Sequence, residues 1–339
     1  MALCRALERV GAGLGQDNVP QTALDTVIAG LGELPLALFD RVVREVVWRG
    51  RLHRQPAVIR ETAGLWSLAR FGLRDRGRGQ LDQLERKPDL AYLLLFHGDG
   101  HLRQAALERM SDPLPSPFFL VALVYRLNDW VPQVRAAAAA ALARVGPATT
   151  VPAISEAMLF LLPRTDEWGR WLDQIAAFEA LLARPDVAEM LADRIGTAIT
   201  GPMARVLRHA LRRPAMDAHL LRLAREGRQP AVRALALTVL TEGEARWPVG
   251  LRTEKKWIDK SMGRYVLVRQ ERTRPITHPI PIEELIEIGA RDKAAPVRLA
   301  AATALARHFD AIPDGRRRAE ALAEDKNRSV RERAAYLLR

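Results

Sequence analysis

The sequence predicts an all-α fold, an α-solenoid of stacked helical hairpins interrupted by one irregular, β-containing basic insert. Three observations support this prediction. An alanine-rich pattern recurs with a period of about 33 residues, and apolar residues elsewhere fall at helical spacing. One stretch near residue 260 breaks both patterns with a basic, β-branched run. The content of 48% hydrophobic and 27% charged residues is typical of a chain with a core, not of a disordered one.

The chain divides into four predicted segments. Residues 1–54 are amphipathic without the repeat and predict N-terminal capping helices, because a terminal repeat must shield the first seam from water. Residues 55–245 hold most copies of the repeat, with a flexible loop expected from Arg74 to Gly79. Residues 246–282 form the basic insert, and residues 283–339 return to repeats.

Four segments share one pattern, in which Val-Arg is followed by alanines and leucines at helical spacing. They begin at Asn128, Glu226, Arg291 and Glu324, and looser copies begin at Gln55 and Gly98. The arginine that every copy has at the same position of the pattern is called its keyed arginine. The keyed arginines are Arg103, Arg135, Arg233, Arg298 and Arg331, and degenerate copies are expected near Arg170 and Arg205. Their separations of 32, 98, 65 and 33 residues are close to one, three, two and one periods.

Each copy has the composition of the second helix of a helical hairpin. An Asp stands six residues before the arginine in three copies, where it can accept from unpaired N–H groups at a helix start. A proline falls where the first helical turn tolerates a missing N–H, and the alanines allow close helix packing. These residues are Asp129, Asp292 and Asp325, and Pro132, Pro230 and Pro296, with Pro56 in the looser first copy. One hairpin cannot bury its apolar face alone, so the copies are expected to stack.

The pattern D-x-x-x-x-V-R-x-x-A-A-x-A-L resembles the HEAT-repeat family, in particular the short HEAT-like repeats of phycobilisome-lyase-type proteins. The resemblance covers roughly Gln55 to Arg339 and is clearest in four copies. It implies about seven to nine stacked hairpins, with the Asp and Arg forming a ladder between neighbouring copies. It indicates a fold and not an activity.

The insert carries nine basic residues between Arg246 and Arg274 against three acids. Its "RYVLVRQ" run predicts a strand, and Pro275, Pro279 and Pro281 predict an extended exit. Because Arg233 and Arg298 lie about two periods apart, the insert is expected to replace the helices of one repeat.

An aromatic and cationic set in the insert is suited to contact a partner. The alternative is that Trp247, Trp257 and Tyr265 pack onto the solenoid while the charges are only solvated, and the sequence leaves both open. The predicted partner-binding residues are Arg252, Lys255, Lys256, Trp257, Lys260, Arg264, Tyr265, Arg269, Arg272 and Arg274.

No enzymatic site is predicted, and neither a metal nor a cofactor. "HGDGH", which contains His97 and His101, predicts a turn because of its two glycines, not a zinc-binding helix face. No histidine is followed by Glu, which argues against the HEAT-like di-iron hydroxylases. No Trp has an acid at the fourth following position, which argues against the HEAT-like alkylpurine DNA glycosylases. Trp168 and Trp171 are expected to pack against a neighbouring repeat.

The charge distribution predicts an acidic partner. Residues 1–200 carry 23 basic and 23 acidic residues, whereas residues 201–339 carry 29 and 17. The expected function is a non-enzymatic protein–protein scaffold that binds an acidic protein surface. The alternative is a nucleic-acid-binding solenoid, similar to the HEAT-like DNA glycosylases, that uses the basic C-terminal part. A lone Cys4, no signal-peptide pattern and no long apolar run predict a cytoplasmic protein without a membrane span.

Overall fold

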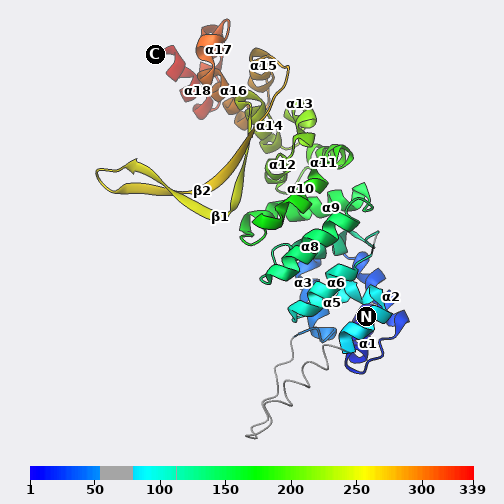
Figure 1. Ribbon diagram of the computed structural model, residues 1–339. Helices are drawn as coiled ribbons and strands as arrows, with labels where there is room; N and C mark the ends of the chain where they lie inside the picture. The colour runs from blue at the N-terminus through cyan, green and yellow to red at the C-terminus, as the bar shows by residue number, and fades with distance from the viewer. Residues whose placement is uncertain (54–78, 112) are drawn as a thin grey trace. The chain divides into compact units, whose positions relative to one another are not determined.

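The computed structural model describes residues 1–53, 79–111 and 113–339. It is mostly helical and contains one two-stranded antiparallel sheet, as expected for an all-α fold with a β-containing insert (Figure 1). The looser first copy at Gln55, with Pro56, lies outside the described residues, as does most of the predicted loop from Arg74.

The chain forms two compact units, a division that the sequence did not predict. The first unit comprises Met1–Phe160 and Trp168–Leu181, and the second comprises Leu161–Glu167 and Leu182–Arg339. The boundary falls inside the segment 55–245 that was expected to form a continuous run of repeats.

The first unit is built from short helices around a core of leucine, alanine and phenylalanine side chains. Within it α1 packs on α2, α5 on α6, and α6 on α8. Its helices are α1 (Ala2–Gly15), α2 (Gln21–Gly32), η1 (Leu36–Leu38), α3 (Phe39–Arg49), residues 79–86, η2 (Pro88–Leu90), α5 (Ala91–Leu94), α6 (Gly100–Arg109), α7 (Pro117–Arg126), α8 (Pro132–Val145), α9 (Val151–Leu161), η4 (Leu172–Gln174) and α10 (Ile175–Leu182).

The second unit contains consecutive helical hairpins and the sheet. Helix α13 packs on α14, α15 on α16 and α17 on α18, and the second helices of these hairpins contact one another in the order α14, α16, α18. Its elements are η3 (Leu162–Glu167), α11 (Pro185–Thr197), α12 (Met203–Ala210), η5 (Pro214–His219), α13 (Leu220–Glu226), α14 (Pro230–Glu242), β1 (Glu244–Asp259), β2 (Arg264–Pro275), α15 (Ile282–Ala290), α16 (Ala295–Arg307), η6 (Phe309–Ala311), α17 (Gly315–Ala323), α18 (Arg328–Ala335) and η7 (Tyr336–Leu338).

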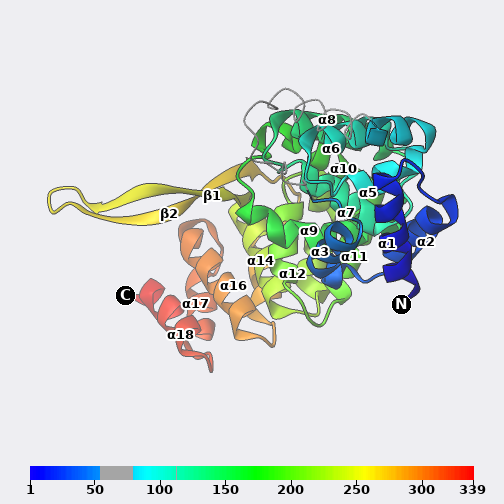
Figure 2. The ribbon, with the colours of Figure 1, turned by 90° about the horizontal axis from the view of Figure 1, so that it is seen from below.

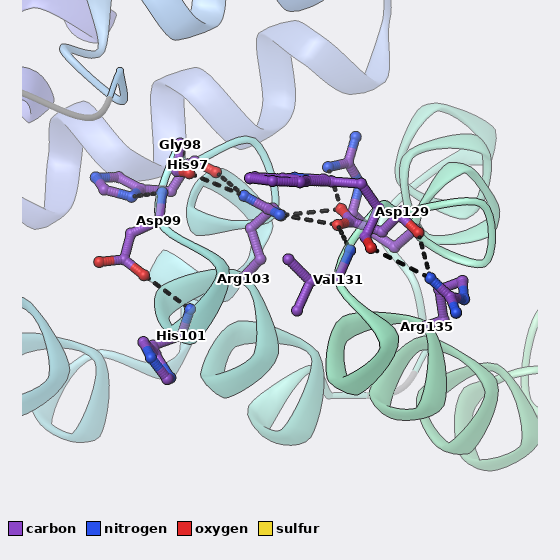
Figure 3. A network of polar contacts seen from close by, with 10 residues as sticks. His97, Gly98, Asp99, His101, Arg103, Asp129, Val131 and Arg135 are labelled. Atoms are coloured by element: carbon purple, nitrogen blue, oxygen red, sulfur yellow. Dashed lines mark hydrogen bonds and ion pairs between the residues drawn. The ribbon is translucent and has the colours of Figure 1, made fainter. Parts of the chain in front are cut away.

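Three of the five keyed arginines join neighbouring copies, as the resemblance implied. Arg103 donates from Nε and Nη2 to both carboxylate oxygens of Asp129, at 3.0 and 2.8 Å (Figure 3). Its Nη1 donates to the carbonyls of His97 and Gly98, in the turn that precedes its own helix. The same two-pronged pairing joins Arg233 to Asp292 and Arg298 to Asp325.

All five keyed arginines make the contact to their own turn. In each, Nη1 donates to the carbonyls six and five residues earlier in the chain. The guanidinium therefore fastens the turn before its helix, and in three copies it also binds the next copy.

The aspartates that pair with the keyed arginines, here called the ladder aspartates, lie two residues before the N-cap of the next helix. They accept a hydrogen bond from the N–H of the N-cap residue. Asp129 Oδ1 accepts from Val131 N at 3.0 Å, and Val131 is the N-cap residue of α8. Asp292 accepts in the same way from Ala294 N. The prolines behave as predicted: each of α8, α14 and α16 has one proline, at its first or second position.

One expectation about the repeats is wrong. Arg170 lies in the turn between η3 and η4, so it does not begin a repeat helix. Arg205 does lie in a helix, α12, which packs on α11 and α14, and its guanidinium binds Asp166, which precedes it in the chain. The packing role of Trp168 and Trp171 is confirmed, because both are buried and their rings meet edge to face.

The insert is added between two adjacent copies and does not replace one. Arg233 pairs directly with Asp292 although they are 59 residues apart in sequence, whereas the other ladder pairs are separated by 26 and 27 residues. Helix α14, before the sheet, packs on α15 and α16, after it. The interval of about two periods therefore holds one repeat step plus an insert about one period long.

Candidate functional site

The insert forms a long antiparallel hairpin, here called the arm, made of β1 and β2. In both ribbon views it extends away from the helices of the second unit (Figure 1 and Figure 2). The register pairs Glu244 with Pro275 at the root and Trp257 with Tyr265 near the tip. The strand predicted at "RYVLVRQ" is confirmed by β2, whereas β1 was missed because Pro248, Gly250 and a run of charges weaken its strand signal.

Arg274 fastens the root of the arm to the helices of the second unit. Its guanidinium donates to the carbonyls of Leu211 and Arg213 at 2.7 and 3.0 Å, and to both oxygens of Asp217 at 2.5 and 2.8 Å. The side chain is only 15% exposed. Arg274 was predicted to bind a partner, but these contacts make it an anchor residue.

Apolar side chains also hold the root. Ala245, Trp247 and Ile276 are buried, so the strands are packed down where they leave and rejoin the helices. The alternative that the aromatic residues pack onto the helices is therefore confirmed for Trp247. It is wrong for Trp257 and Tyr265, which are 45% and 43% exposed.

A buried polar cluster lies beside the root. Asp166 accepts from Arg205 at 2.7 Å, lies 2.6 Å from His209 Nε2, and is 3.9 Å from Arg269 of β2. Burial alone would raise the pKa of Asp166, but the hydrogen bonds from His209 and Arg205, together with the charge of Arg205, outweigh it and lower that pKa. Burial lowers the pKa of His209, so the cluster holds a carboxylate beside a neutral imidazole at pH 7.

Beyond the root, one face of the arm carries cations and apolar groups without a carboxylate. The cross-strand pairs Lys255–Leu267, Trp257–Tyr265 and Thr253–Arg269 share this face, because paired residues in an antiparallel ladder point the same way and every second residue repeats it. We call these six residues the cationic face: Thr253, Lys255, Trp257, Tyr265, Leu267 and Arg269.

The aromatic pair on the cationic face is braced internally. The rings of Trp257 and Tyr265 meet edge to face with centroids 5.4 Å apart. Lys255 Nζ lies 4.5 Å from the centroid of the Tyr265 ring, a cation–π contact. These contacts hold three predicted partner-binding residues in a fixed arrangement on an otherwise exposed ribbon.

The opposite face and the tip are also exposed. The pairs Glu254–Val268 and Lys256–Val266 lie on the opposite face, which therefore includes an acid. At the tip, Met262 is 70% exposed. The exposed apolar residues of the arm were not predicted from the sequence, because apolar side chains in a strand usually indicate burial; they are Ile258, Met262, Val266 and Leu267.

The remaining predicted residues are spread along the arm. Lys260 lies in the turn, Arg264 begins β2, and Arg272 pairs with Trp247 near the root; all three basic side chains are exposed. The backbone of Arg252 lies within β1, but its side chain is outside the described part of the structure. The structure therefore places the predicted basic residues, apart from Arg252, on one ribbon without gathering them into a single cluster.

One acid of the arm is taken up by the turn. Asp259 Oδ1 accepts from Ser261 N, Ser261 Oγ and Met262 N at 2.9, 2.6 and 3.2 Å. The hydrogen bond from the Ser261 hydroxyl, with those from the two backbone N–H groups, lowers the pKa of Asp259. Gly263 completes the turn with φ of 66°, a conformation that favours glycine.

His97 lies in the inter-helix turn that "HGDGH" predicted. Its Nδ1 accepts from Asp99 N at 2.9 Å, and Asp99 in turn accepts from His101 N (Figure 3). Burial lowers the pKa of His97 to about 4. In the ranges that the structure describes, no group of three or more His, Cys, Asp or Glu side chains is suited to hold a metal ion.

Comparison with protein-family models gives no match for this chain, and a search of curated proteins likewise finds none. Within the described ranges, no single helix has the length and apolar character to cross a membrane. The bent pair Gln21–Gly32 and Leu36–Arg49 meets that criterion only when its two parts are taken together.

Proposed function

We propose that this chain is a non-enzymatic interaction scaffold, in which a HEAT-like helical solenoid holds out the arm to an acidic macromolecular partner. The helical copies supply a stiff support, and the arm supplies the contact surface. The repeated contacts of the keyed arginines support the first part, because each copy is fastened to its own turn and three ladder pairs join neighbouring copies.

The observation that carries the proposal is the residue composition of the arm beyond its root. A two-stranded ribbon on its own is marginally stable in water, and its apolar side chains gain from burial against a partner. Trp, Tyr, Met and Arg are the residue types enriched where interfaces concentrate their binding energy. The exposed large apolar residues of the arm are Trp257, Ile258, Met262, Tyr265, Val266 and Leu267. Basic residues lie between and beside them along the strands, at Lys255, Lys256, Lys260, Arg264 and Arg269.

The root supports the same proposal. Arg274 makes four hydrogen bonds to the helices of the second unit, and Trp247 is buried beside it. An arm that is fixed at its root and exposed beyond it loses less conformational entropy on binding than a flexible loop would.

A four-residue charge reversal tests the proposal. Lys255, Lys256, Arg269 and Arg272 are replaced together by Glu, and the tagged chain is purified from its own cells with quantification of the protein and nucleic acid that accompany it. We expect the arm variant to lose at least about 90% of its partner while keeping its helical circular dichroism, because like charges now face an acidic surface.

The matched control reverses four exposed arginines outside the arm, three on helices and Arg291 at the end of α15; they are Arg291, Arg316, Arg317 and Arg328, each more than 70% exposed at its side chain. It changes the net charge by the same amount and is expected to keep the partner. Full partner recovery with the arm variant would mean that the arm is a structural element only.

A further inference from the structure

We infer that the acidic partner of the arm is double-stranded DNA, and that the cationic face enters a groove of the duplex. This inference rests on the proposed function and names the partner class for the same surface. It draws on the charge of the second unit, on the dimensions of a free-standing ribbon, and on the different chemistry of the two faces of the arm.

The charge of the chain favours a polyanion. All of the net charge of +12 comes from residues 201–339, which lie within the second unit and carry 29 basic and 17 acidic residues. Of the three acids between Arg246 and Arg274, Asp259 is held by its own turn. Duplex DNA presents one negative charge for about every 1.7 Å of its axis, so it can match cations spread along an extended arm better than a small acidic patch on a protein.

The shape of the arm fits a groove. Two paired strands lie about 4.8 Å apart, and the major groove of B-form DNA, about 12 Å wide, admits a two-stranded ribbon. Residues 253–259 of β1 span roughly 20 Å at about 3.3 Å per residue, enough to reach across such a groove. The side chains of residues 253–258 are exposed on both faces, so neither face is blocked by the helices.

The side chains of the cationic face are suited to contact base edges in the floor of the major groove. Lys255 and Arg269 can donate to guanine O6 and N7, and the apolar Leu267 can contact a thymine methyl group. The residues of this face between 253 and 269 include no carboxylate, whereas Glu254 lies on the other face. Asp166 of η3 lies 3.9 Å from Arg269, at the root end of the cationic face. The cationic face therefore meets the bases, and the opposite face points away from them.

The aromatic pair favours a duplex over a single strand. Proteins that bind single strands stack bases on open aromatic rings. Here the Trp257 and Tyr265 rings are turned edge to face toward each other, and Lys255 covers one face of Tyr265. The deep and narrow major groove of duplex RNA excludes protein side chains, so DNA fits the arm better than RNA.

Fluorescence anisotropy with a labelled 25-base-pair DNA duplex tests the inference. The full-length chain is titrated at about 50, 100 and 200 mM salt, beside a single strand of the same sequence and the matching RNA duplex. We expect the DNA duplex to bind at least about tenfold more tightly than either, and its affinity to fall with salt as phosphate contacts require.

Two double variants separate the faces at equal charge. Lys255→Gln with Arg269→Gln removes the cations of the cationic face, and Lys256→Gln with Arg272→Gln removes one Lys and one Arg from the opposite face. We expect a loss of at least tenfold in affinity for the first and less than about threefold for the second.

Three results would overturn the inference: no duplex binding at 50 mM salt, equal affinity for the single strand, or equal losses in the two double variants. If the duplex is not bound but the charge-reversed arm still loses a protein partner in the purification above, the inference fails and the proposed function stands. If the charge reversal changes nothing in either experiment, both fail.

Discussion

At the scale of single residues, the ladder depends on the guanidinium group of arginine. Arg103 uses Nε and Nη2 for Asp129 and Nη1 for two carbonyls of its own turn, so its planar fork serves two copies at once. A lysine has one ammonium group and cannot make this set of contacts. Position 103 therefore requires arginine for a geometric reason, and the charge of Arg103 is paired with Asp129.

Arg103→Ala is expected to destabilise the first unit strongly. The Arg103 and Asp129 side chains are 4% and 2% exposed, so the substitution leaves a buried carboxylate whose remaining charged partner, among the described residues, is Arg126. We expect the free energy of unfolding in urea to fall by about 3 kcal/mol. Arg331→Ala is the control, since Arg331 donates only to carbonyls of its own turn in the described contacts, and it is expected to cost about 1 kcal/mol. Equal losses would show that the inter-copy pair adds nothing.

His97 is expected to make the chain less stable as the pH falls from 6.5 to 4. Burial lowers its pKa, the charge of Asp99 opposes that shift and the charges of Arg103 and His53 add to it, which together place the pKa at about 4. Between these pH values the unfolded chain binds a proton that the folded chain does not, which costs stability at up to about 1.4 kcal/mol per pH unit.

The measurement is the free energy of unfolding in urea at several pH values for the wild type and His97→Asn, whose amide oxygen can accept from Asp99 N. We expect a shallower slope for the variant across this window. His209 and His219, whose pKa values are also lowered by burial, leave a residual slope of the same sign. An unchanged slope would contradict the assignment.

At the scale of elements, the arm combines a fixed root with an exposed ribbon. Its root is held by Arg274, Trp247 and Ile276, while the residues from Thr253 to Arg269 contact mainly one another. The direction in which the ribbon points is thus set by a few side chains at the root. Loss of those contacts would change its direction without changing its chemistry.

Arg274→Ala is expected to loosen the root. The substitution removes four hydrogen bonds to Leu211, Arg213 and Asp217, so amide hydrogen exchange should quicken in residues 244–248 and 271–275 while the helices keep their protection. Arg246→Ala is the control, because Arg246 is half exposed and its ion pairs in the described part of the chain are with nearby Glu242 and Glu244. Equal exchange in both variants would show that Arg274 is not the fastener.

The sequence predicted the helical copies better than it predicted the arm. The keyed arginines and their aspartates were identified because a repeated spacing is visible without structure. Strand β1 was missed, since pairing with β2 is non-local and β1 itself contains Pro248 and many charges. Arg274 was assigned to the exposed surface because a sequence shows its charge but not the distant Asp217 that binds it.

At the scale of the whole chain, the arm is an addition between two copies that remain in contact. Ile276 N donates to Gly243 O at 2.8 Å, so the chain leaves and returns at one point. Across that point α14 packs on α16 and Arg233 binds Asp292. An insertion whose ends meet in this way disturbs the surrounding packing little, as with long surface loops in general.

Shortening the arm is therefore expected to leave the helices folded and to abolish partner binding. Residues 249–270 are replaced by Asn-Gly, which joins the paired residues Pro248 and Glu271 through a two-residue hairpin turn. The root residues Trp247 and Arg274 are kept. We expect unchanged helical circular dichroism and a free energy of unfolding within about 1 kcal/mol of the wild type, because the deleted part is mostly exposed.

The same shortened chain separates the two roles that an insert of this kind can have. If the arm is the contact surface, the variant loses both the partner in purification and the DNA duplex in anisotropy while its unfolding transition is retained. If the arm instead ties the helices of the second unit together, the transition shifts to lower urea or loses cooperativity, because the pair of Arg269 with Asp166 goes with the deleted strands. The second outcome would contradict the proposed function at its base, since binding and stability would then fall together.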